Sequence, residues 1–308
     1  MRALTLHAPA KVNLHLRIRG RRTDGLHEIE TLFQKIDLGD TLSLAEAESD
    51  ALEIARSPWE LGPLKENLVW RALQALRRHV AFPPVRLRLT KGIPPGAGLG
   101  GGSSDGAAAL RGIVRLFGLR VAEGTLAAIA RALGADVPFL LSPASCAIGR
   151  GIGDELEPVS HRCRWRLVLV YPGHPSPTAD AYRLWQSVPL PGNSPTLAAL
   201  VAALRSGDAD AAAAAIHSDF APSLFSRYPS MARAAQTLRV LGCSAVWPTG
   251  SGSTVVGLCP AGWSGMEALA VSLPESHWTA WAAMCGDDES SPQTAGNKEK
   301  PRGAGPGA

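Results

Sequence analysis

The stretch IPPGAGLGGGSSDGAAAL, residues 93–110, decides how the rest of this sequence is interpreted. Five of the seven residues from Gly96 to Gly102 are glycine. Glycine is used where φ must be positive or where a ligand must approach the main chain itself. Consecutive N–H groups exposed in such a loop bind anions, and a helix that begins directly afterwards adds its positive end. We therefore expect the loop to bind a phosphorylated ligand, most naturally a triphosphate.

The segments on either side of the loop favour this interpretation. Val85–Leu89 alternates as a strand, Ser103-Ser104-Asp105 is a helix-capping sequence, and a helix is predicted from about Ser104 to Phe117. The alternative is a flexible turn with a chance excess of glycine. The rigid Pro94-Pro95 pair and the abrupt change to helix formers argue against that alternative.

Two other phosphate-binding motifs fit the loop less well. No Lys-Ser or Lys-Thr follows the last glycine, so the loop is not a Walker A sequence. Gly96, Gly98 and Gly101 satisfy the pattern GxGxxG, which is a weak signal alone. The acidic residue that a dinucleotide-binding unit carries on its next strand is not evident.

The rest of the pattern predicts an α+β chain with two lobes. Alternating apolar residues predict strands at residues 3–7, 12–18, 40–44, 51–54, 85–89, 165–171, 244–247 and 254–258. Helical spacing predicts helices at residues 66–80, 104–117, 125–133, 178–186, 197–206, 208–217 and 231–241. We expect an N-terminal domain at residues 1–161, a C-terminal domain at 162–285 and a disordered, polar tail at 286–308.

Composition argues against several other classes of protein. The 308 residues are 45% hydrophobic and 19% charged, which is typical of a globular chain. No apolar run approaches the ~18 residues of a membrane helix, and the N-terminus lacks signal-peptide features, so we expect a cytoplasmic protein with no membrane partner. The five cysteines show no CxxC spacing, which argues against a zinc site. The net charge of +4 is dispersed along the chain, so we expect no nucleic-acid partner.

The glycine loop resembles the second signature motif of the GHMP kinases, a family that binds ATP without a Walker A sequence. Further similarities follow in chain order between about Ala8 and Leu258: APAKVNLHLRI, RRTDGLHEIETLFQKIDLGD, ENLVWRA, LGADVPFLL, GRGIGDELEPV, HSDFAPSLFSRYP and PTGSGSTVVGL. The resemblance implies the two-lobed GHMP kinase fold, with an N-terminal lobe similar to the second domain of ribosomal protein S5 and an α+β sandwich as the C-terminal lobe. The tripled glycine and the SSD ending are similar to one branch, which acts in the non-mevalonate isoprenoid pathway on an alcohol with a cytidine diphosphate head group.

The resemblance implies ATP and Mg²⁺ as cofactors. The ATP-binding residues that it implies are Pro94, Pro95, Gly96, Ala97, Gly98, Leu99, Gly100, Gly101, Gly102, Ser103, Ser104, Asn67 and Lys91. By local sequence Asn67 is also the N-cap of the helix that follows, and the two roles are compatible. The Mg²⁺ ligand is not identified, because the extra glycines obscure which of Ser103 and Ser104 corresponds to the serine of the wider family.

Lys11 and Asp136 are the catalytic residues that the resemblance implies. Phosphoryl transfer to an alcohol needs aligned reactants, neutralised phosphate charge and a group that accepts the hydroxyl proton. Asp136 matches the catalytic position of the family and would be that base, with Lys11 facing it as an electrostatic partner. Local sequence alone favours a helix-capping role for Asp136 and a solvated strand-edge position for Lys11.

Asn13, His27 and Tyr182 are the substrate contacts that the resemblance implies. His27 matches a cytosine contact, Tyr182 matches an aromatic residue that stacks on the base, and Asn13 is expected beside the transferred hydroxyl. Without the resemblance, His27 would be a surface-turn histidine and Tyr182 a core position on a helix. Leu26 departs from the pattern, because the family commonly has an aromatic residue there.

Two other functions stay open at this level. Another GHMP kinase, acting on homoserine, mevalonate or a sugar, would share the loop, although the DGLH segment and Asn13 argue against it. A non-catalytic nucleotide-binding protein on the same scaffold would lack Lys11 or Asp136, and both are present. For the whole protein we expect a small-molecule substrate with a CDP head group and either a monomer or a homodimer.

Overall fold

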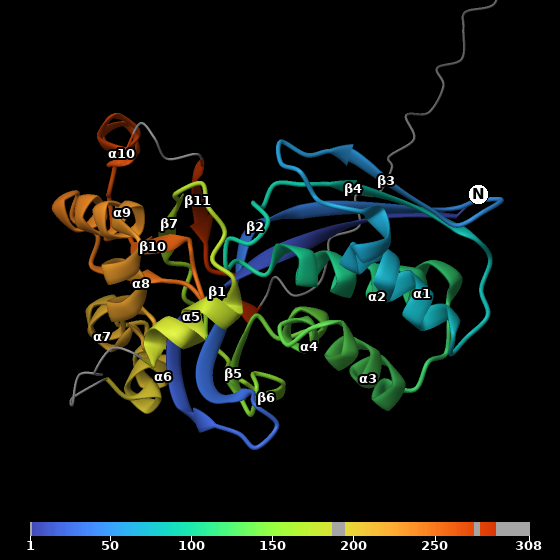
Figure 1. Cartoon of the computed structure of the whole chain (residues 1–308), viewed down its shortest axis with the longest axis horizontal. Helices are drawn as coiled ribbons and strands as arrows, with labels where there is room; N and C mark the ends of the chain where they lie inside the picture. The colour runs from blue at the N-terminus through green and yellow to red at the C-terminus, as the bar shows by residue number, and fades with distance from the viewer. Residues whose placement is uncertain (1, 187–194, 274–277, 288–308) are drawn as a thin grey trace, which may run out of the picture.

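Two sheets organise the chain in the computed structural model, which describes residues 2–186, 195–273 and 278–287 (Figure 1). The described residues form a seven-stranded sheet of order β3-β4-β2-β1-β8, in which β5 pairs with β2 and β6 pairs with β5. A four-stranded sheet has the order β11-β7-β10-β9. The strands are β1 (Ala3–Arg21), β2 (His27–Glu46), β3 (Ala51–Arg56), β4 (Val85–Thr90), β5 (Cys146–Arg150), β6 (Glu155–Pro158), β7 (Arg166–Tyr171), β8 (His217–Ser218), β9 (Ala245–Pro248), β10 (Val255–Leu258) and β11 (Trp278–Ala283).

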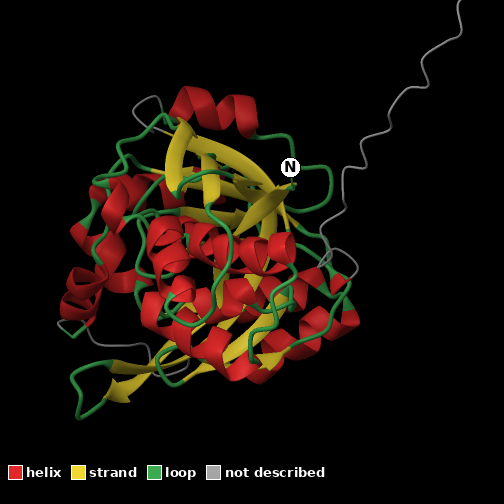
Figure 2. Ribbon diagram, turned by 90° about the vertical axis from the view of Figure 1, so that its right-hand side faces the viewer, coloured by secondary structure: helices red, strands yellow, loops and turns green. Residues whose placement is uncertain are grey.

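Helices cover both sheets, as the two views of the chain show (Figures 1 and 2). They are α1 (Leu68–Arg77), α2 (Gly101–Phe117), α3 (Glu123–Leu133), α4 (Val137–Leu141), α5 (Thr178–Trp185), α6 (Leu197–Ser206), α7 (Ala209–Ala215), α8 (Ala221–Arg227), α9 (Pro229–Val240) and α10 (Met266–Ser272). Buried side chains of β2 and β4, such as Leu42 and Leu87, form one core with Leu73 of α1 and Leu110 of α2. A second core packs α8 and α9 against β7 and β10.

The antiparallel hairpin of β1 and β2 contains the two longest strands described, and it lies within the seven-stranded sheet. The sequence predicted two strands within β1, but the structure has one strand of 19 residues with register shifts between Pro9 and Lys11 and again between Asn13 and His15. Such irregularities let a strand bend and accept a proline. Lys11 and Asn13 therefore lie in the middle of the hairpin, and His27 lies near its tip.

Helix α2 begins earlier than the sequence predicted. Its N-cap is Gly100, with φ 70°, and Gly101 is its first residue, whereas the prediction began at about Ser104. Ser103-Ser104-Asp105 consequently lies inside the helix and does not cap it. The helix starts directly at the end of the glycine loop, so its N-terminal amides lie beside that loop.

The predicted domain boundaries stay predictions. Strand β8 pairs in parallel with β1 and so brings His217 and Ser218, from the predicted C-terminal domain, into the seven-stranded sheet. The predicted tail lies, from residue 288 onward, outside the described residues. The sequence analysis did not predict α8, α10 or β11. Among the helices that the structure describes, none has the length and apolarity needed to cross a bilayer.

Candidate active site

A cleft of 420 Å³ lies between the glycine loop and the opposite turn at residues 250–252. A neighbouring compartment of 570 Å³ shares Ala135, Ile152, Thr178 and Tyr182 with it. The predicted residues that line the cleft are Lys11, Asn13, Asp136, Tyr182 and every loop residue from Pro94 to Ser103. His27 lines the neighbouring compartment. The shared residues place the two compartments side by side.

Contacts within the protein require glycine at some positions of the loop. At Gly98, where φ is +80°, an added Cβ would lie 2.5 Å from the carbonyl oxygen of Thr249 and 2.7 Å from that of Gly252. At Gly100, where φ is +70°, it would lie 3.0 Å from Cγ of Lys11. Real Cβ atoms do not approach main-chain oxygen so closely, so no other residue fits at Gly98 without displacement of the second turn.

Main-chain hydrogen bonds hold the same loop on two sides. The N–H of Lys11 donates to the carbonyl of Leu99 at 2.9 Å, and the N–H of Thr254 donates to that of Ala97 at 3.1 Å. The loop is therefore fixed between β1 and the turn before β10. The alternative of a flexible turn does not fit these contacts.

The end of the loop can receive an anion. Since α2 begins at Gly101, the amides of its first residues have no carbonyl partner within the helix, and its dipole makes this end positive. Gly102 is exposed and Ser103 is half-buried, and both line the cleft. Ser104 is 1% exposed and does not line the cleft, which is contrary to its predicted contact with ATP. Of the two serines, Ser103 is the one that lines the cleft.

Lys11 and Asp136 form an ion pair at the lining of the cleft. Nζ of Lys11 lies 3.3 Å from Oδ2 of Asp136, and the side chains are 4% and 31% exposed. Asp136 precedes α4, but its side chain makes no capping hydrogen bond. The carboxylate is therefore available at the surface of the cleft, and the buried ammonium supplies a positive charge beside it. Asp136 holds the N-cap position that local sequence favoured but makes no capping hydrogen bond, and Lys11 is buried and not solvated.

Asn13 orients the lysine. Nζ of Lys11 donates to Oδ1 of Asn13 at 2.9 Å, and Nδ2 of Asn13 donates to Oγ1 of Thr31 at 2.8 Å. The main chain of Asn13 is fixed as well, because its N–H donates to Oγ1 of Thr249 and its carbonyl accepts from Nε1 of Trp247. The sequence analysis assigned no role to Trp247. Asn13 therefore binds the ammonium of Lys11, and this hydrogen bond fixes the position of the ammonium at the cleft.

An aromatic pair lines the neighbouring compartment. The rings of His27 and Tyr182 stack with centroids 4.1 Å apart at an angle of 7°, and Trp185 meets His27 edge-on at 6.0 Å. Partial burial, with a smaller effect of Arg21, lowers the pKa of His27. Burial, assisted by Asp136, raises the pKa of Tyr182 to about 12, so its hydroxyl is neutral at physiological pH. Leu26 is 50% exposed at the rim of the compartment.

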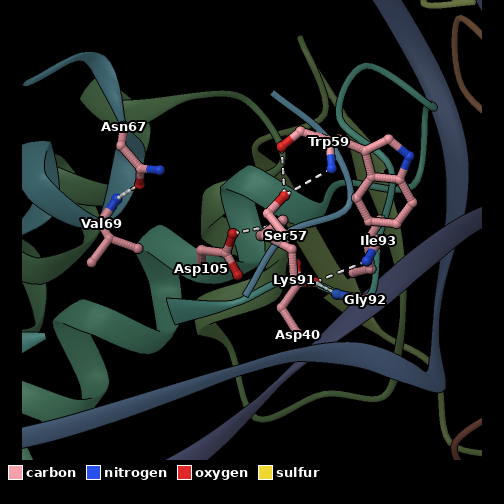
Figure 3. Close-up of polar contacts among 9 residues, drawn as sticks. All are labelled: Asp40, Ser57, Trp59, Asn67, Val69, Lys91, Gly92, Ile93 and Asp105. Carbon is pink, nitrogen blue, oxygen red and sulfur yellow. Dashed lines mark hydrogen bonds and ion pairs between the residues drawn. The ribbon is translucent and has the colours of Figure 1, made fainter. Parts of the chain in front are cut away.

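Asn67 and Lys91 are not among the residues that line the cleft. Figure 3 shows the polar contacts that each of them makes instead. Oδ1 of Asn67 accepts from the N–H of Val69 at 2.9 Å, so Asn67 is the N-cap of α1, which is the role that local sequence indicated. The ammonium of Lys91 is buried between the carboxylates of Asp40 and Asp105. Two carboxylates thus bind this side chain inside the protein, and the predicted contact of Lys91 with ATP stays a prediction. The sequence analysis missed Asp40 and Asp105 as its partners.

The oxygen atoms that line the cleft decide whether Mg²⁺ fits there. Within the described ranges, no group of three or more His, Cys, Asp or Glu side chains could hold a metal ion by itself. Mg²⁺ ordinarily keeps several waters and uses one or two protein oxygens together with substrate phosphates. Ser103 and Asp136, which both line the cleft, fit that smaller protein contribution.

Comparison with protein families identifies the class. The model described as "GHMP kinases N terminal domain" matches residues 67–143, and that described as "GHMP kinases C terminal" matches residues 200–271. The chain belongs to the GHMP kinase family, and its two-lobed α+β fold is confirmed as that of the family.

Similar proteins define the branch. A 4-diphosphocytidyl-2-C-methyl-D-erythritol kinase of Moorella thermoacetica is 39% identical over 265 residues, which are 85% of this chain and 92% of that protein. The enzyme of the same name from Chlorobaculum parvum is 38% identical over 259 residues, 84% and 90% of the two chains. A crystal structure of 4-(cytidine 5′-diphospho)-2C-methyl-D-erythritol kinase is 33% identical, with a TM-score of 0.77 over 92% of this chain and all of that one. Homoserine kinase from Cytophaga hutchinsonii, at 16% identity and a TM-score of 0.66, shares the fold alone.

Proposed function

We propose that this chain transfers the γ-phosphoryl group of ATP to the 2-hydroxyl of 4-diphosphocytidyl-2-C-methyl-D-erythritol. The observation that carries the proposal is the contact between Lys11 and Asp136 at the edge of a cleft whose other wall is the glycine loop. The two relatives compared above, from Moorella thermoacetica and Chlorobaculum parvum, bear the name of this kinase. No observation favours homoserine, mevalonate or a sugar as the acceptor.

The loop and the start of α2 would bind the triphosphate. Main-chain amides at the helix N-terminus donate to phosphate oxygens without any side chain, and the loop is fixed before a ligand arrives. When bound, Mg²⁺ would supply charge neutralisation at the β- and γ-phosphates. Ser103, at the start of α2, is the residue that would hold it. The exposed, side-chain-free Gly102 leaves room for phosphate oxygens next to the helix.

Asp136 would accept the proton of the attacking hydroxyl. The hydroxyl oxygen forms a bond to the γ-phosphorus, the bond from that phosphorus to the β–γ bridging oxygen breaks, and ADP leaves with the bond electrons. Lys11, whose ammonium lies 3.3 Å from Oδ2 of Asp136, would stabilise the negative charge that grows on the attacking oxygen. Asn13 holds this lysine in place.

The neighbouring compartment would bind the cytosine. Because His27 and Tyr182 already stack at 4.1 Å, a base cannot lie between them as they stand. We propose that cytosine replaces His27 as the stacking partner of Tyr182 and that the imidazole, kept neutral by its lowered pKa, moves to the polar edge of the base. Leu26 would cover the ring from the open side with an apolar contact in place of an aromatic one.

The test is a coupled assay for ADP release with the purified chain. 4-Diphosphocytidyl-2-C-methyl-D-erythritol, mevalonate and homoserine are supplied in turn with ATP and Mg²⁺. We expect turnover with the first alcohol and at most background with the other two. Turnover with mevalonate or homoserine alone would reassign the acceptor, and ATP binding without turnover on any alcohol would leave only a nucleotide-binding protein.

Two further expectations concern the location of the protein in the cell and its oligomeric state. We place the enzyme in the cytoplasm, where ATP is available, and fractionation of cells that express the tagged full chain tests this placement. Light scattering of the purified chain distinguishes a monomer from a homodimer, both of which are compatible with an active site built within one chain.

A further inference from the structure

Two of the five cysteines lie close together in the C-terminal half of the chain. Cys243 lies in the link between α9 and β9, and Cys259 directly follows β10. These two strands pair antiparallel, with Ala245 opposite Leu258. The register therefore brings Cys243 and Cys259 to the same end of the β9–β10 hairpin, which is the end opposite to its turn.

Both sulfur atoms lie beside Gly257, the third residue of β10. A Cβ added to Gly257 would lie 2.7 Å from Sγ of Cys243, so this cysteine occupies the space of the missing side chain. Side chains two residues apart on a strand point to the same face, so Cys259 faces the side on which Cys243 lies. Sγ of Cys259 lies 3.9 Å from the carbonyl oxygen of Gly257. The two thiols accordingly contact each other through a hydrogen bond.

The two thiols differ in their access to solvent. Cys259 is buried in the core that packs α8 and α9 against β7 and β10, whereas Cys243 is half-buried at the edge of that core. A small molecule in solution therefore reaches Cys243 first. Cys259 also lines a cavity of 630 Å³, whose wall includes Arg166 and Trp263. This cavity leaves the side chain of Cys259 room to turn toward Cys243.

The hydrogen bond between the thiols makes Cys243 the better nucleophile. This bond lowers the pKa of the Cys243 thiol, and burial opposes the change. The same bond, together with burial, raises the pKa of Cys259 and keeps that thiol protonated. The thiolate is the reactive form of cysteine, and redox-sensitive cysteines are accessible, have a low pKa and often lie next to a second cysteine. Cys243 meets these conditions, with Cys259 as the second cysteine.

We propose that Cys243 and Cys259 are a modification site, at which hydrogen peroxide oxidises the two thiols to an intramolecular disulfide. The thiolate of Cys243 attacks one oxygen of the peroxide and the O–O bond breaks. This step leaves a sulfenic acid on Cys243 and a hydroxide ion, which takes the proton that the thiol has lost. The sulfur of Cys259 then attacks the sulfur of the sulfenic acid, the S–O bond breaks, and the hydroxyl group leaves as water with the proton of Cys259. Two thiols thus lose two electrons, and one peroxide becomes two molecules of water.

The other cysteines are less suited to this reaction. Cys146 is 1% exposed, and burial raises the pKa of its thiol. Cys163 is buried as well, and its Sγ donates to the carbonyl oxygen of Leu204 at 3.1 Å. Cys285 is half-buried, as Cys243 is, but it follows β11, at the opposite edge of the four-stranded sheet from β9. Cys285 is therefore the matched control for accessibility.

The experiment treats the purified, fully reduced chain with a small molar excess of hydrogen peroxide, blocks the remaining thiols with N-ethylmaleimide and identifies the products by mass spectrometry. We expect a monomeric product that has lost two hydrogen atoms and gained no oxygen, and that dithiothreitol reduces again. Chymotrypsin cleaves after Leu258, between the two cysteines, and should release a disulfide-linked pair of peptides that carry Cys243 and Cys259. The thiol of Cys243 should disappear at least about tenfold faster than that of Cys285.

Two variants separate the steps. In Cys259→Ser the second sulfur is absent, so the sulfenic acid on Cys243 should persist and react with dimedone, whereas the parent should give little of this adduct. Cys285→Ser should form the disulfide as the parent does. The inference is overturned if Cys243 and Cys259 of the parent stay reduced, or if the disulfide joins other cysteines or two chains. Since this outcome is measured on the parent, a folding defect in either variant does not affect it.

This site is separate from the cleft, because neither cysteine lines it. The inference therefore does not depend on the proposed phosphoryl transfer, and the failure of one leaves the other unchanged.

Discussion

Replacing Gly98 by alanine is expected to separate the two glycine turns that form the cleft. At φ +80° an L-residue incurs about 1–2 kcal/mol of backbone strain. The new Cβ would also meet the carbonyl oxygens of Thr249 and Gly252 at 2.5 and 2.7 Å, and relief of such overpacking costs about 1–3 kcal/mol more. We therefore expect Gly98→Ala to lower the free energy of unfolding by about 3 kcal/mol. Because the shift displaces the loop, ATP affinity should fall by about tenfold or more.

Gly118→Ala is the matched control for this variant. Gly118 also has a positive φ, +61°, but an added Cβ would meet no heavy atom within 4 Å. Only the backbone term remains, so the expected loss is about 1 kcal/mol, with ATP affinity unchanged. Urea denaturation gives the free energies and calorimetry gives the ATP affinities. Equal losses of stability in the two variants, with unchanged ATP affinity in both, would refute the reasoning that the two turns hold each other in place.

Three further predictions concern single side chains. Asp136→Asn should lower kcat by about 10²–10⁴-fold in rapid-quench kinetics, while calorimetry should show an ATP dissociation constant within about twofold of the parent value. Near-parental turnover would remove Asp136 from the role of base. Tyr182→Ala should raise KM for the cytidine alcohol by about tenfold through loss of base stacking and leave KM for ATP unchanged, and a parallel rise in both constants would contradict a cytosine contact. Burial lowers the pKa of Lys35 from 10.5 to about 7, so between these values the unfolded chain binds more protons and the free energy of unfolding rises with pH. Lys35→Met should remove that rise in urea denaturation at pH 7, 8.5 and 10, and persistence of the slope would assign it to another group.

The sequence sufficed to locate the phosphate-binding loop but not to say what approaches each glycine. Gly98 faces the main chain at Thr249 and Gly252, about 150 residues away in sequence, and no local pattern reveals such a partner. The start of α2 was placed about three residues late, because Gly-Gly-Ser has low helix propensity. At a helix N-terminus this low propensity is outweighed by tertiary packing, here of Gly101 against Ile93.

Lys11, Asn13 and Asp136 line one cleft, and the resemblance to the family, not local sequence, predicted that they lie together. Local reasoning would have left Lys11 at a solvated strand edge, whereas it is buried beside Asn13 and Asp136 through the pairing of two long strands. Lys91, which the resemblance implied as an ATP contact, has a side chain that is bound by the carboxylates of Asp40 and Asp105. The sequence did not reveal these two buried partners, since charged residues are mostly exposed.

Phosphorus NMR of the reaction product tests the central claim most directly. The parent chain is incubated with ATP, Mg²⁺ and 4-diphosphocytidyl-2-C-methyl-D-erythritol labelled with ¹³C at C2. We predict one new phosphomonoester signal that is coupled to the labelled carbon, in amounts equal to the ADP formed, and its absence with Asp136→Asn. A new phosphate on another carbon, or ADP formed without any phosphomonoester, would contradict the account in which Asp136 activates the 2-hydroxyl beside the glycine loop.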